Sequence, residues 1–511
     1  MTAADLDSLA LLTAAQMAAC DAATIPAGTK GIVLMERAGR AVAEAALRRT
    51  TPGERILVLC GPGNNGGDGF VAARLLAAEG RAVSLALAGD PAALRGDAAL
   101  AAGGWSGAVL PLAEASPEGC SLVIDALFGA GLSRPLEGEV AAMVTRLNRL
   151  ALPVLAVDMP SGASGDSGLA AGVAVQAAET VTFFRLKPGH LLHPGRALCG
   201  AVTLADIGID PAHVFGPGGV TPYACRNAPG LWQVELPRHG EATHKFGRGA
   251  VLVAAGGLAG VGAPRLGARA ALRSGAGLAT ILCTPDALPV HAARGPDAVM
   301  QVAIADEVAL DELLDTRRAE ALLIGPALGL DERGHALTLA ALRRATLPAV
   351  FDADAVTHLA RDPELAMQAG PARQAPFVLT PHEGEFMRLF GHVAACAPGL
   401  AKPERAAAAA RLSGGIVVLK GADSVIAAPD GRLAINATGS PALATAGSGD
   451  VLGGIITGLL AQGMPAFEAA CAAVYLHGRA GERLGMGLIA DELPEALPPL
   501  LVEVRGQASH D

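Results

Sequence analysis

The sequence predicts an α/β protein of two domains, each built around a parallel sheet. The chain has 511 residues, more than one ordinary hydrophobic core accommodates. Short continuous apolar runs alternate with segments of helical spacing, a pattern typical of parallel strands that helices cover on both faces. The alternation is interrupted at residues 210–232, which are rich in proline and glycine and lack clear periodicity. We therefore expect a linker there, with domains at residues 1–225 and 226–511.

The first series of apolar runs predicts a Rossmann-like, three-layer domain with a parallel sheet. Ahead of it, residues 12–46 contain amphipathic helical pieces that the segment IPAG interrupts. These pieces are expected to pack on the domain or to form an oligomer contact. Strands are expected at residues 55–60, 82–89, 121–129, 153–160, 179–184 and 201–208.

The second series of apolar runs predicts another α/β domain with one antiparallel hairpin. The turn APDGR at residues 428–432 separates two apolar segments, which is typical of a hairpin. Two helical stretches are expected after Ser448. The apolar runs, hairpin included, lie at residues 250–257, 279–284, 321–329, 348–354, 377–385, 416–424 and 424–436.

Composition and charge exclude several classes of protein. The mean hydropathy of +0.40 raises the question of a membrane protein. The longest apolar stretch, residues 250–264, is broken by glycines and is shorter than the roughly 18 to 20 residues of a spanning helix. The net charge of −10 comes without a basic stripe, which argues against nucleic-acid binding. Eight scattered cysteines without a CxxC pair indicate reduced, mostly buried thiols, so we expect a cytoplasmic enzyme.

The loop after the first strand is a candidate phosphate cradle. Residues 61–69 read GPGNNGGDG, and the glycines let backbone amides approach an anion at the start of the following helix. Residues 61–66 also satisfy GxGxxG, and Asp90 at the end of the next strand imitates the ribose-binding acid of a Rossmann site. The same aspartate fits an ordinary Gly-Asp-Pro turn, so both interpretations of Asp90 stay open.

Two further strand ends of the first domain carry carboxylates. Asp125 precedes a second glycine loop that contains Arg134, and Asp158 is followed by Ser161. With Asn65 these groups form a set of oxygen donors suited to a cation or to proton transfer. Taken alone, each aspartate fits a turn or helix cap better than a site. Because the carboxyl ends of parallel strands meet at one sheet edge, the three loops together favour a site.

GPGNNGGDG, the stretch from Asp125 to GAGLSR, and DMPSG together resemble the YjeF N-terminal domain, the NAD(P)H-hydrate epimerase, over residues 16–215. The resemblance implies interconversion of the R and S forms of hydrated NADH and NADPH. It places a potassium ion at Asn65, Asp125 and Ser161, and Asp158 at the substrate as the group that handles the proton. The residues that it implies for nucleotide binding are Asn64, Asn65, Gly66, Gly67, Asp68, Gly129, Ala130, Gly131, Leu132, Ser133, Arg134 and Pro135.

The second domain ends in a Gly-Ser-Gly-Asp turn that opens an apolar helix. Backbone amides at that helix start form an anion hole, and Asp450 places a carboxylate beside it. Phosphoryl transfer to a hydroxyl requires this pair of features. A plain capped helix explains the turn as well. The polar residues Lys420, Ser424 and His382 follow other apolar strands and favour a site.

This GxGD placement resembles the ribokinase-like superfamily, and the segments LTPHEGE, KGADS and GSGDVLGGIITGLLAQG resemble the YjeF C-terminal domain, the NAD(P)H-hydrate dehydratase, over residues 235–505. The resemblance implies ADP rather than ATP as phosphate donor, with magnesium as counterion. For the adenine nucleotide it implies Lys420, Gly421, Ala422, Asp423, Ser424 and Gly449, and for the hydrated cofactor Ala263, Ala327, His382 and the base Asp450. The chain departs from the family pattern at Ala327 and Ala446, where glycine is usual.

The preferred hypothesis is therefore a bifunctional repair enzyme, expected to be a homo-oligomer, that epimerises hydrated NAD(P)H and dehydrates the S form with ADP. One alternative keeps the ribokinase-like fold but makes the product a stable phosphate, as in vitamin-precursor or sugar kinases. Another alternative treats the first domain as a nucleotide-sensing or scaffold module without catalysis.

Overall fold

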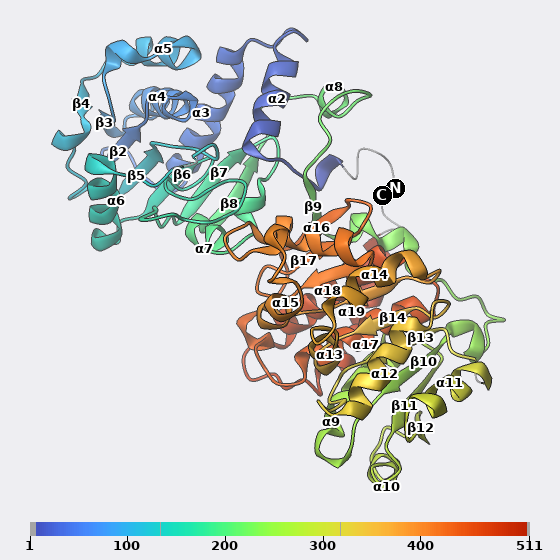
Figure 1. The fold of residues 1–511 in the computed structure, drawn as a ribbon. Helices are drawn as coiled ribbons and strands as arrows, with labels where there is room; N and C mark the ends of the chain where they lie inside the picture. The colour runs from blue at the N-terminus through green and yellow to red at the C-terminus, as the bar shows by residue number, and fades with distance from the viewer. Residues whose placement is uncertain (1–6, 133, 317, 508–511) are drawn as a thin grey trace. The chain divides into compact units, whose positions relative to one another are not determined.

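The computed structural model describes residues 7–132, 134–316 and 318–507, which form two compact units. One unit ends at Cys225 and the other begins at Arg226 (Figure 1). Each unit has its own sheet and its own hydrophobic core. All eight cysteines are free, and only Cys225 is partly exposed, as predicted. No helix in the described part of the chain combines the length and apolarity that crossing a bilayer requires.

The N-terminal unit contains a parallel sheet with the strand order β4-β3-β2-β5-β6-β7-β8. The order reverses between β2 and β5, which makes the gap beyond their carboxyl ends the usual ligand position of such a sheet. All six predicted strands are confirmed, whereas the three-residue β4 is too short to show a sequence pattern. The bounds are β2 Arg55–Cys60, β3 Ala82–Leu87, β4 Val109–Pro111, β5 Leu122–Ala126, β6 Val154–Val157, β7 Glu179–Phe183 and β8 Ala201–Ala205.

Alternating residues of β2 explain how this sheet is covered on both faces. Ile56 and Val58 pack in one core with helices α3 and α4, whereas Leu57 and Leu59 pack in another with α6. A strand buried on both sides reads as a continuous apolar run, which is why the sequence revealed it. The helices are α2 Ala14–Thr24, α3 Gly31–Leu47, α4 Asn64–Ala78, α5 Gly96–Gly103, α6 Gly138–Leu150, α7 Gly195–Cys199 and α8 Pro211–Val214. The predicted interruption of the first helical region is confirmed between α2 and α3.

The C-terminal sheet has the order β1-β9-β18-β17-β16-β15-β14-β13-β10-β11-β12, parallel from β16 to β12. The predicted hairpin is confirmed by the antiparallel pair β17–β18, closed where the Ala428 amide donates to the Arg432 carbonyl at 2.9 Å. Three strands of this sheet were not predicted: β12 at one edge, β1 (Ala10–Leu11) at the other, and β9, which lies in the expected linker and pairs with β1. The bounds are β9 Ala224–Asn227, β10 Ala250–Ala254, β11 Leu278–Cys283, β12 Val299–Ala303, β13 Ala321–Ile324, β14 Ala349–Phe351, β15 Phe377–Leu379, β16 Ile416–Leu419, β17 Val425–Ala427 and β18 Leu433–Asn436.

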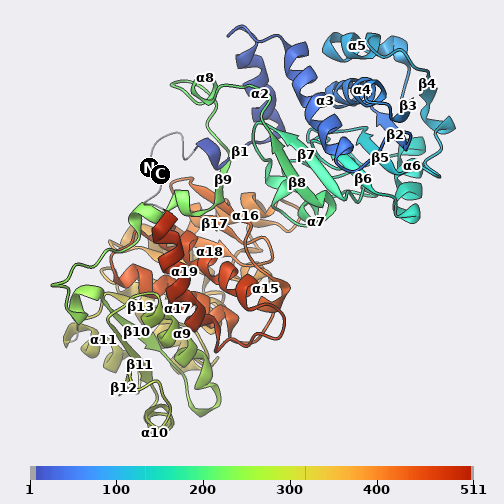
Figure 2. The same cartoon turned by 180° about the vertical axis from the view of Figure 1, so that it is seen from behind.

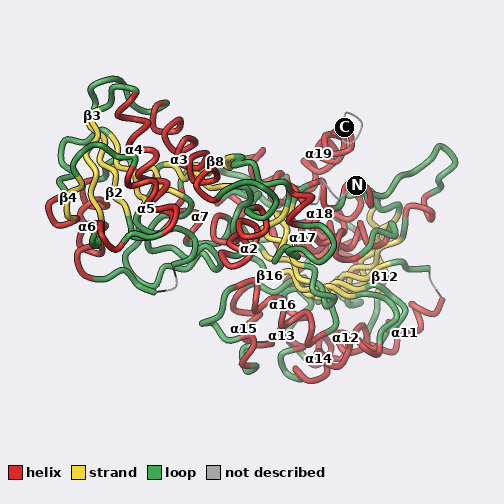
Figure 3. The backbone as a smooth tube through the Cα atoms, turned by 90° about the horizontal axis from the view of Figure 1, so that it is seen from above, coloured by secondary structure: helices red, strands yellow, loops and turns green. Residues whose placement is uncertain are grey.

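Helices lie on both faces of the C-terminal sheet, which confirms the predicted α/β/α layering (Figure 3). One layer holds α9 Gly262–Arg273, α17 Ser448–Ala461, α18 Ala466–Leu484 and α19 Leu493–Gln507, seen from its outer side in Figure 2. The opposite layer holds α11 Glu307–Thr316, α12 Glu332–Arg343, α13 Asp354–Leu359, α14 Pro363–Ala372, α15 Glu383–Phe390 and α16 Lys402–Ser413, while α10 Leu288–Ala292 precedes β12.

Up to Gln507, where the described residues end, three helices follow Gly447, whereas two were predicted. The helix that was not predicted is α19. Its internal Pro498 and Pro499 argue against a helix when the sequence is considered alone. Close packing of α17 on α9 fixes the site described below. A Cβ on Gly454 would overlap the carbonyl oxygen of Gly267, so only glycine allows this approach of the two backbones.

Candidate active sites

A cavity of about 650 Å³ opens at the carboxyl ends of β2, β5 and β6. It brings together most residues predicted from the three loops: Asn64, Asn65, Asp68, Gly129, Ala130, Gly131, Leu132, Arg134 and Asp158. Three predicted contacts, Gly66, Gly67 and Pro135, do not line it. Ser133 lies outside the described residues.

The glycines of the loop after β2 allow close packing of the backbone as well as the approach of a ligand. A Cβ on Gly61 would overlap the Leu127 carbonyl, and one on Gly66 would overlap the Gly61 carbonyl. A Cβ on Gly67 would lie 2.6 Å from the Met35 side chain. The loops after β2 and β5 can therefore meet only because Gly61 carries no side chain, while Gly66 and Gly67 allow the loop to fold on itself and to pack on α3. Asp90 accepts a hydrogen bond from the Ala92 amide at 2.9 Å, so of its two interpretations the structure supports the turn.

Asp158 is held by three donors at the cavity wall. Its Oδ1 accepts hydrogen bonds from Lys187 Nζ at 2.6 Å and Thr182 Oγ1 at 2.9 Å, and its Oδ2 accepts one from the Ala130 amide at 2.9 Å. Lys187 is 1% exposed and so places a buried ammonium group beside the carboxylate. Burial alone would raise the pKa of Asp158, but Lys187 and these hydrogen bonds outweigh it and lower the pKa to about 2. Asp158 is therefore ionised at neutral pH.

The pKa values of two other carboxyl groups in the cavity are raised, whereas that of Asp158 is lowered. Burial, together with the charges of Asp158 and Asp21, raises the pKa of Asp68 well above its usual value. Burial raises the pKa of Asp21, on α2, to about 6. Asp21 and Lys187 were not predicted as site residues, although Lys187 lies in the polar run KPGH shortly after β7.

Asp125 and Ser161, predicted as potassium ligands, are in direct contact. Ser161 donates from Oγ to Asp125 Oδ1 at 2.6 Å and from its amide to Oδ2 at 2.8 Å. Burial raises the pKa of Asp125 to about 6 despite these hydrogen bonds. Asn65 and Asp158 both approach Gly129, since a Cβ there would be 2.9 Å from Asn65 Oδ1 and 3.0 Å from Asp158 Oδ2. Within the described residues Asn65 Nδ2 is buried without a hydrogen-bond partner.

The C-terminal unit contains a second cluster of charged groups, at the N-terminus of α17. Lys420, which follows β16, contacts Asp352 Oδ1 at 2.6 Å and Glu385 Oε2 at 3.9 Å. Asp450 lies in the first turn of α17, where burial and then the charge of Asp352 raise its pKa to about 7. The positive charge of Lys420 opposes this rise in pKa but does not cancel it. An ionisable base thus lies beside helix-terminal amides, as the GSGD turn predicts.

The ammonium group of Lys420 is less free to contact nucleotide phosphates than the sequence suggests. We expected it to meet nucleotide phosphates, yet it is 19% exposed and is neutralised by Asp352 and Glu385. Burial would lower its pKa, but these carboxylates outweigh burial and raise it. A Cβ on Gly449 would lie 3.6 Å from Lys420 Nζ, so the missing side chain keeps space free beside this cation. Asp352 and Glu385 were not predicted as site residues.

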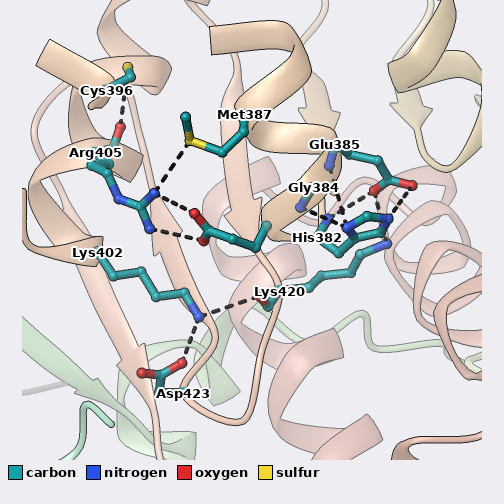
Figure 4. Close-up of polar contacts among 10 residues, drawn as sticks. His382, Gly384, Glu385, Met387, Cys396, Lys402, Arg405, Lys420 and Asp423 are labelled. Atoms are coloured by element: carbon teal, nitrogen blue, oxygen red, sulfur yellow. Dashed lines mark hydrogen bonds and ion pairs between the residues drawn. The ribbon is translucent and has the colours of Figure 1, made fainter. Parts of the chain in front are cut away.

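Side chains of the loop and of α16 close the loop KGADS, and Figure 4 shows the contact of Lys402 with Asp423. Ser424 Oγ donates to the Gly421 carbonyl at 2.9 Å and accepts from the Gly421 amide at 3.1 Å. Lys402, from α16, donates to Asp423 Oδ1 at 2.6 Å and to the Lys420 carbonyl at 3.3 Å. Gly421 and Ala422 at the tip are exposed. The loop is therefore preformed, with Gly421 and Ala422 at the surface.

His382 caps α15 and also presents its ring to solvent (Figure 4). Its Nδ1 accepts hydrogen bonds from the amides of Gly384 at 3.0 Å and Glu385 at 3.4 Å. The neutral ring therefore carries its proton on Nε2, 3.2 Å from Glu385 Oε1. The side chain is 55% exposed, so capping does not prevent contact with a ligand.

Ala327, where the family pattern has glycine, lies in a left-handed backbone conformation with φ of 47°. A Cβ on Gly260 would overlap the Cβ of Ala327, so the two loops meet here. The Gly329 amide donates to Asp354 Oδ2 at 3.0 Å, which holds the same loop. Ala263 lies in the first turn of α9. Among the described residues no hydrogen bond or ion pair links Ala263, Ala327 or His382 to Asp450.

We expect Ala327→Gly to stabilise the chain by about 1 kcal/mol, because glycine adopts a positive φ without the clash that a Cβ causes. Chemical denaturation of the full chain measures the change. Ala407→Gly is the matched control, since Ala407 lies inside α16, where the same substitution costs about 1 kcal/mol. Destabilisation by both substitutions would contradict strain at Ala327.

Comparison with known proteins agrees with these two clusters. Residues 31–189 match the family described as YjeF-related protein N-terminus, and residues 251–497 match the family described as NAD(P)H-hydrate dehydratase. The bifunctional NAD(P)H-hydrate repair enzyme Nnr of Moorella thermoacetica is 38% identical over 96% of both chains. The enzyme of the same name from Escherichia coli is 33% identical over 94% of this chain and 91% of that one.

Among solved structures, the chain is similar to the ADP/ATP-dependent NAD(P)H-hydrate dehydratase of Bacillus subtilis co-crystallised with ATP and Mg²⁺. The identity is 30%, over 55% of this chain and 98% of that chain, with a TM-score of 0.48. The near-complete coverage of the repair enzymes, at more than 30% identity, decides the family. The chain belongs to the bifunctional NAD(P)H-hydrate repair enzymes, which join an epimerase unit to a dehydratase unit.

Proposed function

We propose that the cavity before Arg226 interconverts the R and S forms of hydrated NADH and NADPH, and that the Asp450 cluster dehydrates the S form with ADP and magnesium. The observation that carries the proposal is the position of Asp450. It is a carboxylate whose pKa of about 7 lets it accept a proton near neutral pH, at the amide-rich start of α17.

In the proposed dehydration, Asp450 takes the proton of the ring hydroxyl, whose oxygen attacks the terminal phosphorus of ADP. The bond to the leaving AMP breaks, phosphate then leaves with the carbon–oxygen electron pair, and loss of a ring proton restores the double bond. The preformed loop Lys420–Ser424 and Gly449 would hold the adenine nucleotide, and Ala263, Ala327 and His382 the hydrated cofactor.

Magnesium would neutralise the ADP phosphates. The carboxylates of Asp352 and Glu385 already face Lys420, which favours a metal held mainly by the nucleotide.

In the proposed epimerisation, the ionised Asp158 faces the substrate at the cavity wall, and residues of the loops after β2 and β5 bind the nucleotide. Asn65, Asp125 and Ser161 would hold potassium. Their oxygen donors suit a hard cation, and Asp125 is a buried carboxylate with no cationic side chain among the causes of its pKa shift. A bound cation would keep Asp125 ionised.

Potassium is expected to stabilise the protein and speed epimerisation, relative to choline at equal ionic strength. At 100 times its Kd, an ion that binds only the folded state adds about 2.7 kcal/mol to the free energy of unfolding. The effect should weaken below about pH 6, where Asp125 takes up a proton. Thermal melts of the wild type and Asp125→Asn measure it, and an equal potassium response of both proteins would contradict the site.

The direct test incubates the full chain with a mixture of R and S hydrated NADH and follows the absorbance of reduced nicotinamide. With ADP and magnesium the whole mixture should be recovered, and without ADP none. Phosphorylation of a vitamin precursor without any recovery would support the kinase alternative instead. If Asp158→Ala converts the R form as fast as wild type, the epimerase assignment fails.

The proposal also includes a cytoplasmic homo-oligomer, on the strength of the family resemblance. Light scattering after gel filtration measures the oligomeric state.

A further inference from the structure

The N-terminal cavity contains more carboxylates than its one buried ammonium group can neutralise. Asp21 from α2, Asp68 from α4 and Asp158 after β6 all line it, as does Lys187. Lys187 forms its ion pair with Asp158. No described residue donates a hydrogen bond to the carboxyl group of Asp21 or Asp68. Among the described residues Asp158 thus has donors at both carboxylate oxygens, whereas Asp21 and Asp68 have none, and a fourth carboxylate, Asp97 of α5, also lines the cavity.

Asp68 is the more deeply buried of the two unpartnered carboxylates. Its residue is 8% exposed, whereas Asp21 lies in a partly exposed position. An unpaired charge at such a position is costly, and the group avoids this cost by keeping its proton. Burial and the negative charges of Asp158 and Asp21 raise the pKa of Asp68 accordingly, and Lys187 only partly opposes them. The surroundings of Asp68 thus favour its protonated form, and those of Asp158 favour its ionised form, in one cavity.

We propose that Asp68 donates the proton to the departing hydroxyl of hydrated NAD(P)H and takes it back when water returns, while Asp158 remains a fixed anion facing the ring. This inference rests on the proposed epimerase function. It assigns proton transfer to Asp68, where the sequence alone favoured Asp158.

The proposed step balances without any further reactant. The Asp68 proton moves to the hydroxyl oxygen, the carbon–oxygen bond breaks, and its electron pair leaves with water. The ring becomes a cation, which the Asp158 carboxylate stabilises because it cannot easily take up a proton itself. Water adds to the opposite face of the ring, and its proton returns to the Asp68 carboxylate.

Asp21 acts as a positioning residue, because its charge helps Asp68 to keep its proton. The other ionisable groups around Asp68 are Asp158 and Lys187, the neutral thiol of Cys60 on β2, and Asp97 of α5 and Arg134, which line the same cavity. His190 donates from Nε2 to the Asp158 carbonyl at 2.8 Å, and burial lowers its pKa to about 4, so it stays uncharged above that pH.

The test measures initial rates of R-form conversion across pH for full-length wild type, Asp68→Asn and Asp21→Asn. Wild-type kcat should fall at alkaline pH as Asp68 loses its proton. Asp68→Asn should reduce kcat by at least about 100-fold with little change in KM, since it removes general acid catalysis and keeps the shape of the side chain. Asp21→Asn should move the alkaline limb of the profile to lower pH. Asp90→Asn, the same change at an exposed turn, is the matched control.

Dehydration of the S form by the same proteins shows whether they are folded and loaded with ADP. If wild type turns over and Asp68→Asn keeps more than a third of its rate, the role of Asp68 is overturned and the epimerase function stands. If Asp21→Asn does not shift the pH at which kcat falls on the alkaline side, the role of Asp68 is also overturned. This readout holds even where Asp68→Asn does not fold. A wild type that cannot convert the R form overturns the proposed epimerase function and the role of Asp68 together.

Discussion

Asp450→Asn is expected to reduce dehydration of S-form hydrated NADH by about 100- to 10,000-fold, the range typical for loss of a general base. The amide has nearly the same shape as the carboxylate, so packing of α17 on α9 should not change. The loss should appear in kcat, because the missing interaction acts only while the hydroxyl attacks phosphorus. Conversion of the R form should continue, since it takes place in the other unit.

The pH dependence of dehydration gives a second readout for Asp450. A base must be ionised to act, and the pKa of Asp450 is about 7 because burial and the charge of Asp352 raise it. The value of kcat/KM should therefore rise with pH and level off above about 7, and this limb should be absent from the residual activity of Asp450→Asn.

Asp430→Asn, at an exposed turn of the same unit, is the matched control for Asp450→Asn. An unchanged dehydration rate in Asp450→Asn would exclude the base role. A rate that falls equally in both variants would point to a general effect of the substitution.

Lys187→Met is expected to destabilise the protein by about 3 to 5 kcal/mol and to reduce epimerisation at least about 100-fold. Lys187 is the buried cation that faces Asp158, at 2.6 Å, and its removal leaves that carboxylate without an ionic partner. Asp158 would then take up a proton more readily, and the cavity would lose the anion that we expect to stabilise the ring cation.

A double-mutant cycle separates these two effects of Lys187. Lys187→Met combined with Asp158→Asn should regain much of the stability, because no charge is left unpaired, but should not regain epimerisation. Lys30→Met, at an exposed position before α3, controls for the loss of a lysine in this unit. Full epimerase activity in Lys187→Met, or additive stability losses in the double variant, would contradict a coupled Lys187–Asp158 pair.

Much of the fold and of the site was predictable from short segments of the sequence. Strands buried on both faces read as continuous apolar runs, so those of both parallel sheets, except short or edge strands such as β4 and β12, were found. The loops that line the N-terminal cavity were predictable because they follow strands directly, and parallel strands end at the same sheet edge. The helix α19 was missed because its prolines argue against it, whereas packing in the tertiary structure retains it.

By itself, the sequence determined which motifs lie at the strand ends, since strand periodicity and glycine-rich turns are local properties of the chain. Only the tertiary structure decided which charges meet. Lys187 joins Asp158 from 29 residues away, and Lys420 joins Asp352 from 68 residues away. Protonation was also beyond the sequence. Asp68 and Asp158 have the same side chain, but burial and neighbouring negative charges raise the pKa of Asp68, whereas a buried ammonium group lowers that of Asp158.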